Sequence, residues 1–135
     1  MAKHTKTHHF WRNLAVLAVL LGVYLYWGNS SIETDEVRFS SPALPAGFDG
    51  CRIVQLSDLH GKSFGENNER LYAAVRAARP EYIFITGDLV DRRTENPTVY
   101  AGETGAALSA IAPTYYVTGN HEWGHGTAAV EEIKR

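Results

Sequence analysis

The chain of 135 residues carries 13 basic and 15 acidic side chains, a formal net charge of −2. Residues 1–31 hold three of the basic side chains and no acidic one, which leaves 10 basic against 15 acidic side chains, a charge of −5, in residues 32–135. This acidic part argues against a nucleic-acid-binding surface, which is normally basic. The single cysteine, Cys51, excludes an internal disulfide.

An uncharged run of 20 residues extends from Asn13 to Ile32 and has a strongly apolar centre. As a helix rising 1.5 Å per residue, this run spans about 30 Å, which is the hydrocarbon thickness of a bilayer. Aromatic residues at both of its ends resemble the interfacial belts of a spanning helix. We therefore predict a transmembrane signal-anchor at residues 13–31. A signal peptide cleaved near Gly28-Asn29-Ser30 is the alternative.

Three basic residues, Lys3, Lys6 and Arg12, precede the apolar run. Under the positive-inside rule they predict that residues 1–12 form a cytoplasmic tail. Residues 32–135 would then form a domain on the other side of the membrane.

The apolar and polar patterns of residues 32–135 predict alternating strands and helices. Residues 36–41 alternate enough to predict a first edge strand. Three apolar stretches predict further strands, and amphipathic or capped stretches predict helices. The strands are expected at 52–57, 82–86 and 113–117, and the helices at 66–79, 98–111 and from 127 onward. This order predicts an α/β layered fold with mostly parallel strands.

Each of the three apolar strands runs into a polar loop: Asp58-Leu-His60, Gly87-Asp88-Leu-Val-Asp91-Arg92 and Gly119-Asn120-His121-Glu122. Parallel neighbouring strands bring such loops to one edge of a sheet. Carboxylate, imidazole and amide oxygen are ligands that first-row divalent metals accept, and a carboxylate can bridge two ions. The loops therefore predict a two-metal site, with His121 as a proton donor because histidine titrates in the useful range.

Each motif alone also has an ordinary structural interpretation. Asp-x-His is often a capped turn, and Asp91 and Arg93 could form a surface ion pair. The occurrence of all three motifs directly after three predicted strands favours the metal site.

In this order and spacing, the three motifs resemble the calcineurin-like metallophosphoesterase superfamily, and within it the membrane-anchored bacterial YkuE/YaeI-like branch. The resemblance implies a four-layer αββα sandwich, of which residues 32–135 are the N-terminal part. It implies two divalent ions such as Mn, Fe or Zn. Asp58 and His60 would bind one ion, Asp88 would bridge both, and Asn120 would bind the second.

The resemblance also implies roles around the reacting group. His121 would contact or protonate the leaving group, Asp91 would orient His121, and Arg92 would assist phosphate binding. The family completes its metal site with further histidines from a second half, in a Gly-His pair and a Gly-His-x-His motif. These 135 residues lack that second half, and His125 is their only histidine after Glu122. We therefore expect an N-terminal portion of a longer enzyme, which in isolation binds metal weakly, exposes an apolar sheet face and has low activity.

The predicted function is metal-dependent hydrolysis of a phosphomonoester, phosphodiester or pyrophosphate by a hydroxide that bridges two metals. The expected substrate is a phosphorylated small molecule or a lipid head group. A catalytically inactive, membrane-tethered binding module is the alternative that the missing histidines motivate. A structural membrane protein is a third interpretation, which leaves the three polar loops unexplained.

Overall fold

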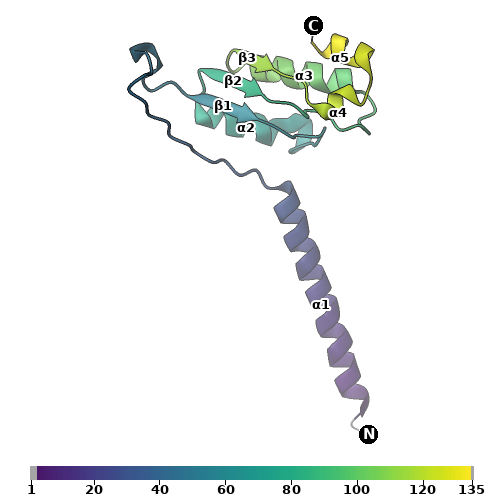
Figure 1. Ribbon diagram of the computed structural model, residues 1–135. Helices are drawn as coiled ribbons and strands as arrows, with labels where there is room; N and C mark the ends of the chain where they lie inside the picture. The colour runs from purple at the N-terminus through teal and green to yellow at the C-terminus, as the bar shows by residue number, and fades with distance from the viewer. Residues whose placement is uncertain (1–2, 135) are drawn as a thin grey trace. The chain divides into compact units, whose positions relative to one another are not determined.

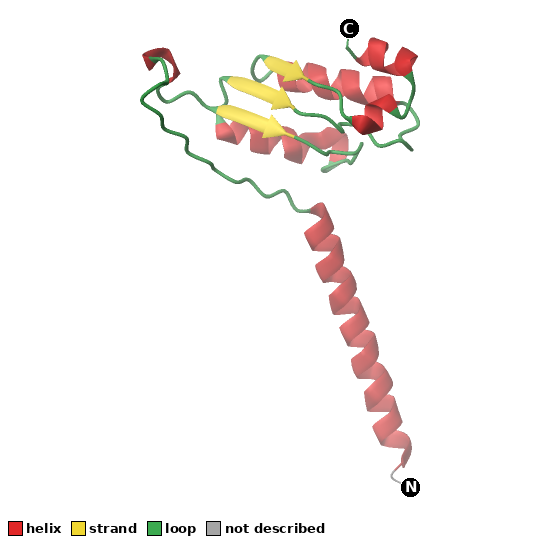
Figure 2. Cartoon of the chain, in the orientation of Figure 1, coloured by secondary structure: helices red, strands yellow, loops and turns green. Residues whose placement is uncertain are grey.

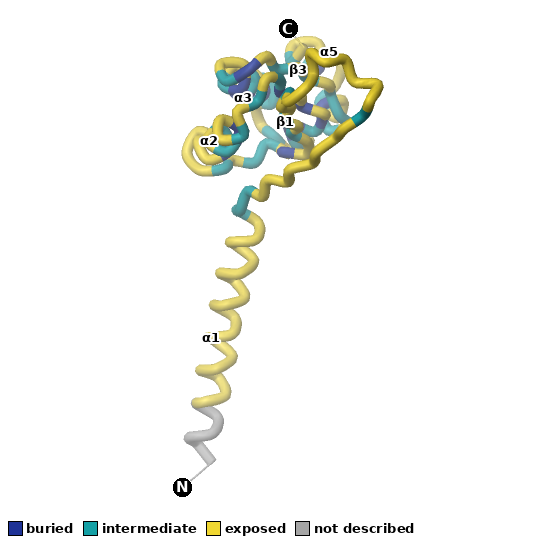
Figure 3. Tube along the Cα trace, turned by 90° about the vertical axis from the view of Figure 1, so that its left-hand side faces the viewer, coloured by how far each residue is buried: buried dark blue, intermediate teal, exposed yellow. Residues whose placement is uncertain are grey.

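The computed structural model describes residues 3–134. The chain divides into two compact units, and the boundary in the sequence lies between Glu33 and Thr34. The first unit contains one helix, α1 (Lys3–Ser30) (Figure 1). Within it, His9–Ser30 is long and apolar enough to cross a membrane by length and composition. Residues 9–29 are all exposed, and Figure 3 draws this part of α1 in the colour of exposed residues.

The second unit is built on a three-stranded parallel sheet with the order β1-β2-β3 (Figure 2). The strands are β1 (Ile53–Leu56), β2 (Tyr82–Ile85) and β3 (Thr114–Tyr116). In the ladder, Val54 pairs with Ile83, and Ile83 pairs with Thr114. The structure confirms these three predicted strands and the α/β class.

The helices are α2 (Glu69–Ala78), α3 (Pro97–Ser109), the single turn α4 (Asn120–Trp123) and α5 (Thr127–Ile133). Two short 3₁₀ turns lie at Ala46–Phe48 and Glu66–Asn68. The prediction of α2, α3 and α5 is confirmed, with Pro97 in the first turn of α3, where its missing N–H costs nothing. The sequence pattern did not predict α4, because four residues are too few to show a helical period.

The core lies between one face of the sheet and the helices α2 and α3, which both lie behind the strands in Figure 1. Ile83 and Ile85 of β2 are buried there with Val75 of α2 and Leu108 of α3. Because side chains alternate along a strand, the residues between them point to the other face. This is how one short strand can serve both the core and the open face.

The opposite face of the sheet is apolar and open. Ile53, Phe84, Tyr115 and Val117 are all exposed, and the Phe84 and Tyr115 rings stack with centroids 5.5 Å apart. The structure thus has the exposed apolar sheet face that the sequence led us to expect.

The prediction of a strand at residues 36–41 is wrong. Within the described chain these residues pair with no strand, and Val37 is 89% exposed. Alternation of apolar and polar residues predicts a strand only where a neighbouring edge supplies hydrogen-bond partners. Residues 36–41 have no such neighbour here.

We predict that the two faces of the sheet differ sharply in their effect on stability. Ile83→Ala, at a position that is 0% exposed, should lower the free energy of unfolding by about 2–5 kcal/mol because it opens a cavity. Ile53→Ala is the matched control: the same change at a position that is 54% exposed should cost less than about 1 kcal/mol. Urea unfolding of the two variants measures the difference. Equal losses would mean that the face around Ile53 is covered in the folded protein.

Candidate metal centre

The loops that follow β1, β2 and β3 meet at one edge of the sheet because backbone hydrogen bonds continue past the strand ends. The Asp58 N–H donates to Gly87 O (3.2 Å), and the His60 N–H donates to Asp88 O (2.9 Å). On the other side of β2, the Val117 N–H donates to Ile85 O (2.9 Å). The first two loops are therefore locked to each other at the residues predicted to bind metal.

Three of the predicted metal ligands have left-handed backbone conformations. The φ angles are +56° at Asp58, +52° at His60 and +51° at Asp88. This region costs a residue other than glycine about 1–2 kcal/mol, and such strain concentrates at functional sites. The polar loops thus accept unfavourable backbone angles at the positions where the side chains have to converge.

The ends of β2 and β3 approach each other so closely that both need glycine. A Cβ at Gly87, where φ is +103°, would lie 2.9 Å from Gly119 Cα. A Cβ at Gly119 would lie 2.6 Å from Asp88 N and would also overlap the Asp88 carboxylate. Two glycines in contact therefore allow Asp88 to lie directly against the loop that carries Asn120 and His121.

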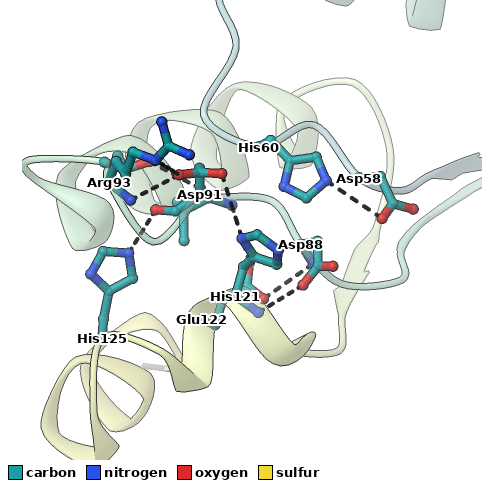
Figure 4. Close-up of polar contacts among 10 residues, drawn as sticks. Asp58, His60, Asp88, Asp91, Arg93, His121, Glu122 and His125 are labelled. Carbon is teal, nitrogen blue, oxygen red and sulfur yellow. Dashed lines mark hydrogen bonds and ion pairs between the residues drawn. The ribbon is translucent and has the colours of Figure 1, made fainter.

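Two overlapping groups of metal-ligand atoms result, as Figure 4 shows. The first contains Asp58, His60 and Asp88, and the second contains His60, Asp91 and His121; within each group the ligand atoms lie within 4.8 Å of one another. His60 Nε2 is 3.7 Å from Asp58 Oδ1, and the rings of His60 and His121 make an edge contact with centroids 4.6 Å apart. Carboxylate and imidazole donors at these separations fit divalent first-row ions.

His121 lies beside Asp91 at the centre of the site. His121 Nδ1 is 3.6 Å from Asp91 Oδ2, and this buried nitrogen has no hydrogen-bond partner among the described residues. The Arg93 N–H donates to Asp91 Oδ1 (2.9 Å) and is the main reason that the pKa of Asp91 is lowered. Partial burial opposes this shift, and the positive charges of His121 and Arg93 reinforce it. Asp91 is therefore an ionised neighbour of the His121 ring.

His125 holds the same loop from the other side. Its Nε2 lies 2.8 Å from the carbonyl oxygen of Asp91, and because a carbonyl can only accept, Nε2 carries the proton. In the sequence, its position four residues after His121 was the one signal that it could join the site, against the alternative of an ordinary loop histidine.

Glu122 was not singled out as a site residue from the sequence, yet it lies directly under the site and is completely buried (Figure 4). Its carboxylate accepts hydrogen bonds from the backbone of both neighbouring loops. Burial alone would raise the pKa of Glu122, but the groups that donate to its carboxylate, foremost the Val90 N–H, outweigh it and lower the pKa. The available signal was the spacing Gly119-x-x-Glu122, an acid at the third position of a helical turn.

The remaining predicted residues lie around this cluster. Asn120 is exposed and begins α4, next to His121. The Arg92 side chain packs against Gly124, where an added Cβ would lie 2.8 Å from Arg92 Cγ. Arg93 is 96% exposed in its side chain and lines an open depression of about 450 Å³ together with His60, Gly61, Asp91 and Thr94. The depression therefore opens beside the cluster of carboxylate and imidazole groups.

The parallel sheet and the cluster at its edge define an α/β protein with a candidate divalent-metal centre. The calcineurin-like phosphoesterase family matches residues 51–134, so the chain belongs to that family. All three motifs fall inside the matched region.

Several curated proteins are similar to the chain. It is 30% identical to an uncharacterized metallophosphoesterase of Campylobacter jejuni over 100% of the chain and 37% of that protein. It is 32% identical to the uncharacterized metallophosphoesterase YkuE of Bacillus subtilis over 76% of the chain and 37% of YkuE. A transmembrane protein with a metallophosphoesterase domain from Danio rerio is 30% identical over 80% of the chain and 25% of its own length. The chain thus spans between a quarter and little more than a third of the length of these relatives, and no solved structure matches it.

We predict that the glycine contact at the strand ends is essential for the site. Gly119→Ala should lower stability by about 1–3 kcal/mol, because the new methyl group has to displace the Asp88 backbone, and it should also weaken Mn²⁺ binding. Gly102→Ala in α3 is the matched control: it meets nothing within 4 Å and should raise stability by about 0.5–1 kcal/mol. Thermal unfolding and a Mn²⁺ titration of both variants test this. Unchanged Mn²⁺ binding in Gly119→Ala would contradict it.

Proposed function

We propose that the protein is a metal-dependent phosphohydrolase. The convergence of carboxylate and imidazole side chains from three consecutive strand ends, with ligand atoms within 4.8 Å, is the observation that carries this proposal. Membership in the calcineurin-like phosphoesterase family supports it. A protein that only bound a partner would have no need for three strained ligand positions at one sheet edge.

In this proposal Asp58, His60, Asp88 and Asn120 would hold two divalent ions. When bound, the ions supply an activated water as nucleophile and neutralise the charge of the phosphoryl oxygens. Asp88 suits a bridging role because its loop contacts both neighbouring loops.

His121 is the proposed proton donor to the leaving group. Its Nδ1 faces Asp91 at 3.6 Å, which leaves Nε2 to deliver the proton. An ionised Asp91 stabilises the protonated imidazole and fixes the orientation of the ring, as a carboxylate does for other catalytic histidines.

The substrate is proposed to be a phosphate ester or pyrophosphate whose phosphoryl group enters the open depression beside His60 and Asp91. Arg93 lines this depression, and Arg92 is the second guanidinium group on the same loop. A guanidinium group offers paired donors that match phosphate oxygens. If Arg92→Ala and Arg93→Ala both leave the KM for the phosphate ester unchanged, neither arginine binds the phosphoryl group.

Two substitutions should separate the proton donor from the metal ligands. His121→Ala should lower kcat for bis(p-nitrophenyl) phosphate by about 10² or more while Mn²⁺ content stays unchanged, because general acid catalysis contributes on this scale. Asp88→Asn should instead lose Mn²⁺, since an amide supplies one neutral oxygen in place of a charged bridge.

His9→Ala, at an exposed histidine of α1, is the control and should leave both quantities unchanged. Full turnover with both metals retained in Asp88→Asn would contradict the assignment. Mn²⁺ binding by the wild-type protein without hydrolysis of any phosphate ester would favour the inactive binding module instead.

We further propose that α1 anchors the protein in a membrane with residues 1–12 in the cytoplasm and residues 32–135 outside it. The span His9–Ser30 and the similarity to proteins named as transmembrane support membrane attachment. The three basic residues before the span support the orientation. A catalytic domain beside the outer surface would place phospholipid head groups within reach.

Cys51 provides a test of this orientation, because it is the only cysteine of the 135 residues and lies in the second unit. A membrane-impermeant maleimide should label it in intact cells, and Cys51→Ser should abolish that labelling. Burial raises the pKa of the Cys51 thiol, and the Glu81 carboxylate raises it further, so the reaction is best run at mildly alkaline pH. Labelling that appears only after lysis would place the domain in the cytoplasm.

A further inference from the structure

Glu122 is the only fully buried charged side chain among residues 9–134, for which burial is described. A carboxylate removed from water is costly unless several hydrogen bonds replace its hydration. Burial at this point, between the loop after β2 and the loop after β3, therefore calls for a specific set of partners.

Three backbone N–H groups supply those partners. Glu122 Oε2 accepts from Gly119 N (2.7 Å) and from Asp88 N (3.1 Å), while Oε1 accepts from Val90 N (3.1 Å). Gly119 belongs to the loop after β3, whereas Asp88 and Val90 belong to the loop after β2. One carboxylate thus joins two loops that are about 30 residues apart in sequence.

A fourth hydrogen bond runs in the opposite direction, from the turn that carries Glu122 to Asp88. The Asp88 carboxylate accepts from the backbone N–H of His121 (2.9 Å), so Asp88 and the turn that carries Glu122 bind each other at two points (Figure 4). The left-handed backbone of Asp88, with φ at +51°, is held between these two contacts. The same set of hydrogen bonds therefore positions both Asp88, the proposed bridging ligand, and His121, the proposed proton donor.

We propose that Glu122 is a positioning residue that fixes Asp88 relative to His121 and thereby sets the metal affinity of the site. Glu122 lies below the ligand groups and acts through the backbone, without contact to the substrate. The inference deepens the proposed function, on which it rests for the role of the site, and its main readout is metal binding.

An amide in place of the carboxylate is nearly the same size but cannot serve both loops. In Glu122→Gln the single oxygen can accept either from Val90 or from Gly119 and Asp88, and the NH₂ group then faces N–H donors on the other side. Removing one partner of such a buried network leaves donors unsatisfied. The side-chain volume and the packing of α4 are otherwise preserved.

The test uses the whole protein purified in detergent, with Mn²⁺ as the probe and calorimetric titration as the readout. Glu122→Gln should bind Mn²⁺ at least about tenfold more weakly, the scale expected when a group that supports metal ligands is changed. The amide protons of Asp88, Val90 and Gly119 should exchange with solvent faster in the same variant. Restoring a carboxylate with Glu122→Asp should recover part of the affinity.

Two controls separate positioning from general destabilisation. Glu132→Gln makes the same chemical change at an exposed residue of α5 and should leave the Mn²⁺ affinity unchanged. Val130→Ala removes volume from a 0% exposed core position and should lower the melting temperature without a comparable loss of Mn²⁺ affinity.

Wild-type Mn²⁺ affinity in folded Glu122→Gln would overturn the inference, and so would an equal loss in Val130→Ala at the same melting temperature. If Glu122→Gln does not fold, Glu122→Asp decides: weaker Mn²⁺ binding supports the inference and unchanged binding overturns it. If the wild-type protein hydrolyses no phosphate ester while Glu122→Gln still loses Mn²⁺ affinity, the proposed function fails and the inference stands. If the wild-type protein hydrolyses a phosphate ester and Glu122→Gln keeps both this hydrolysis and its Mn²⁺ affinity, the proposed function stands and the inference fails.

Discussion

The parallel pairing of β1, β2 and β3 is the constraint on which the rest of this structure depends. Parallel strands end at the same edge of their sheet, so each following loop starts beside the others. The helices between the strands return the chain to the opposite edge and cover one face of the sheet. Three short polar motifs that are about 30 residues apart can therefore form one site, although each is unremarkable in isolation.

At that edge the backbone is locally strained, and this strain allows the side chains of the three loops to lie close together. Asp58, His60 and Asp88 adopt left-handed backbone angles, and Gly87 and Gly119 touch where no side chain would fit. Hydrogen bonds between the loops offset this cost, and many of them involve backbone groups that would otherwise end a strand unpaired. Three of the six non-glycine residues with positive φ in the described chain thus lie where backbone contacts join the loops, which is typical of a functional site.

The sequence predicted the elements with a clear period and missed those without one. The three strands and the helices α2, α3 and α5 follow from apolar runs and their end signals. Residues 36–41 show the limit of such patterns, because alternation does not reveal whether a neighbouring strand exists. The single turn α4 shows another limit, because four residues carry no period.

For the site, the sequence indicated which residues meet but not how their side chains are held. Asp58, His60, Asp88 and His121 were predictable because each follows a strand. The burial of Glu122, the hydrogen bond of His125 and the outward direction of Arg93 depend on loop dihedral angles, which no motif specifies.

The central claim, that the three strand ends form one metal centre, is tested most directly by anomalous X-ray scattering from crystals of the Mn²⁺-loaded whole protein. We predict anomalous peaks within bonding distance of Asp58, His60 and Asp88. Peaks confined to any other part of the chain would contradict it.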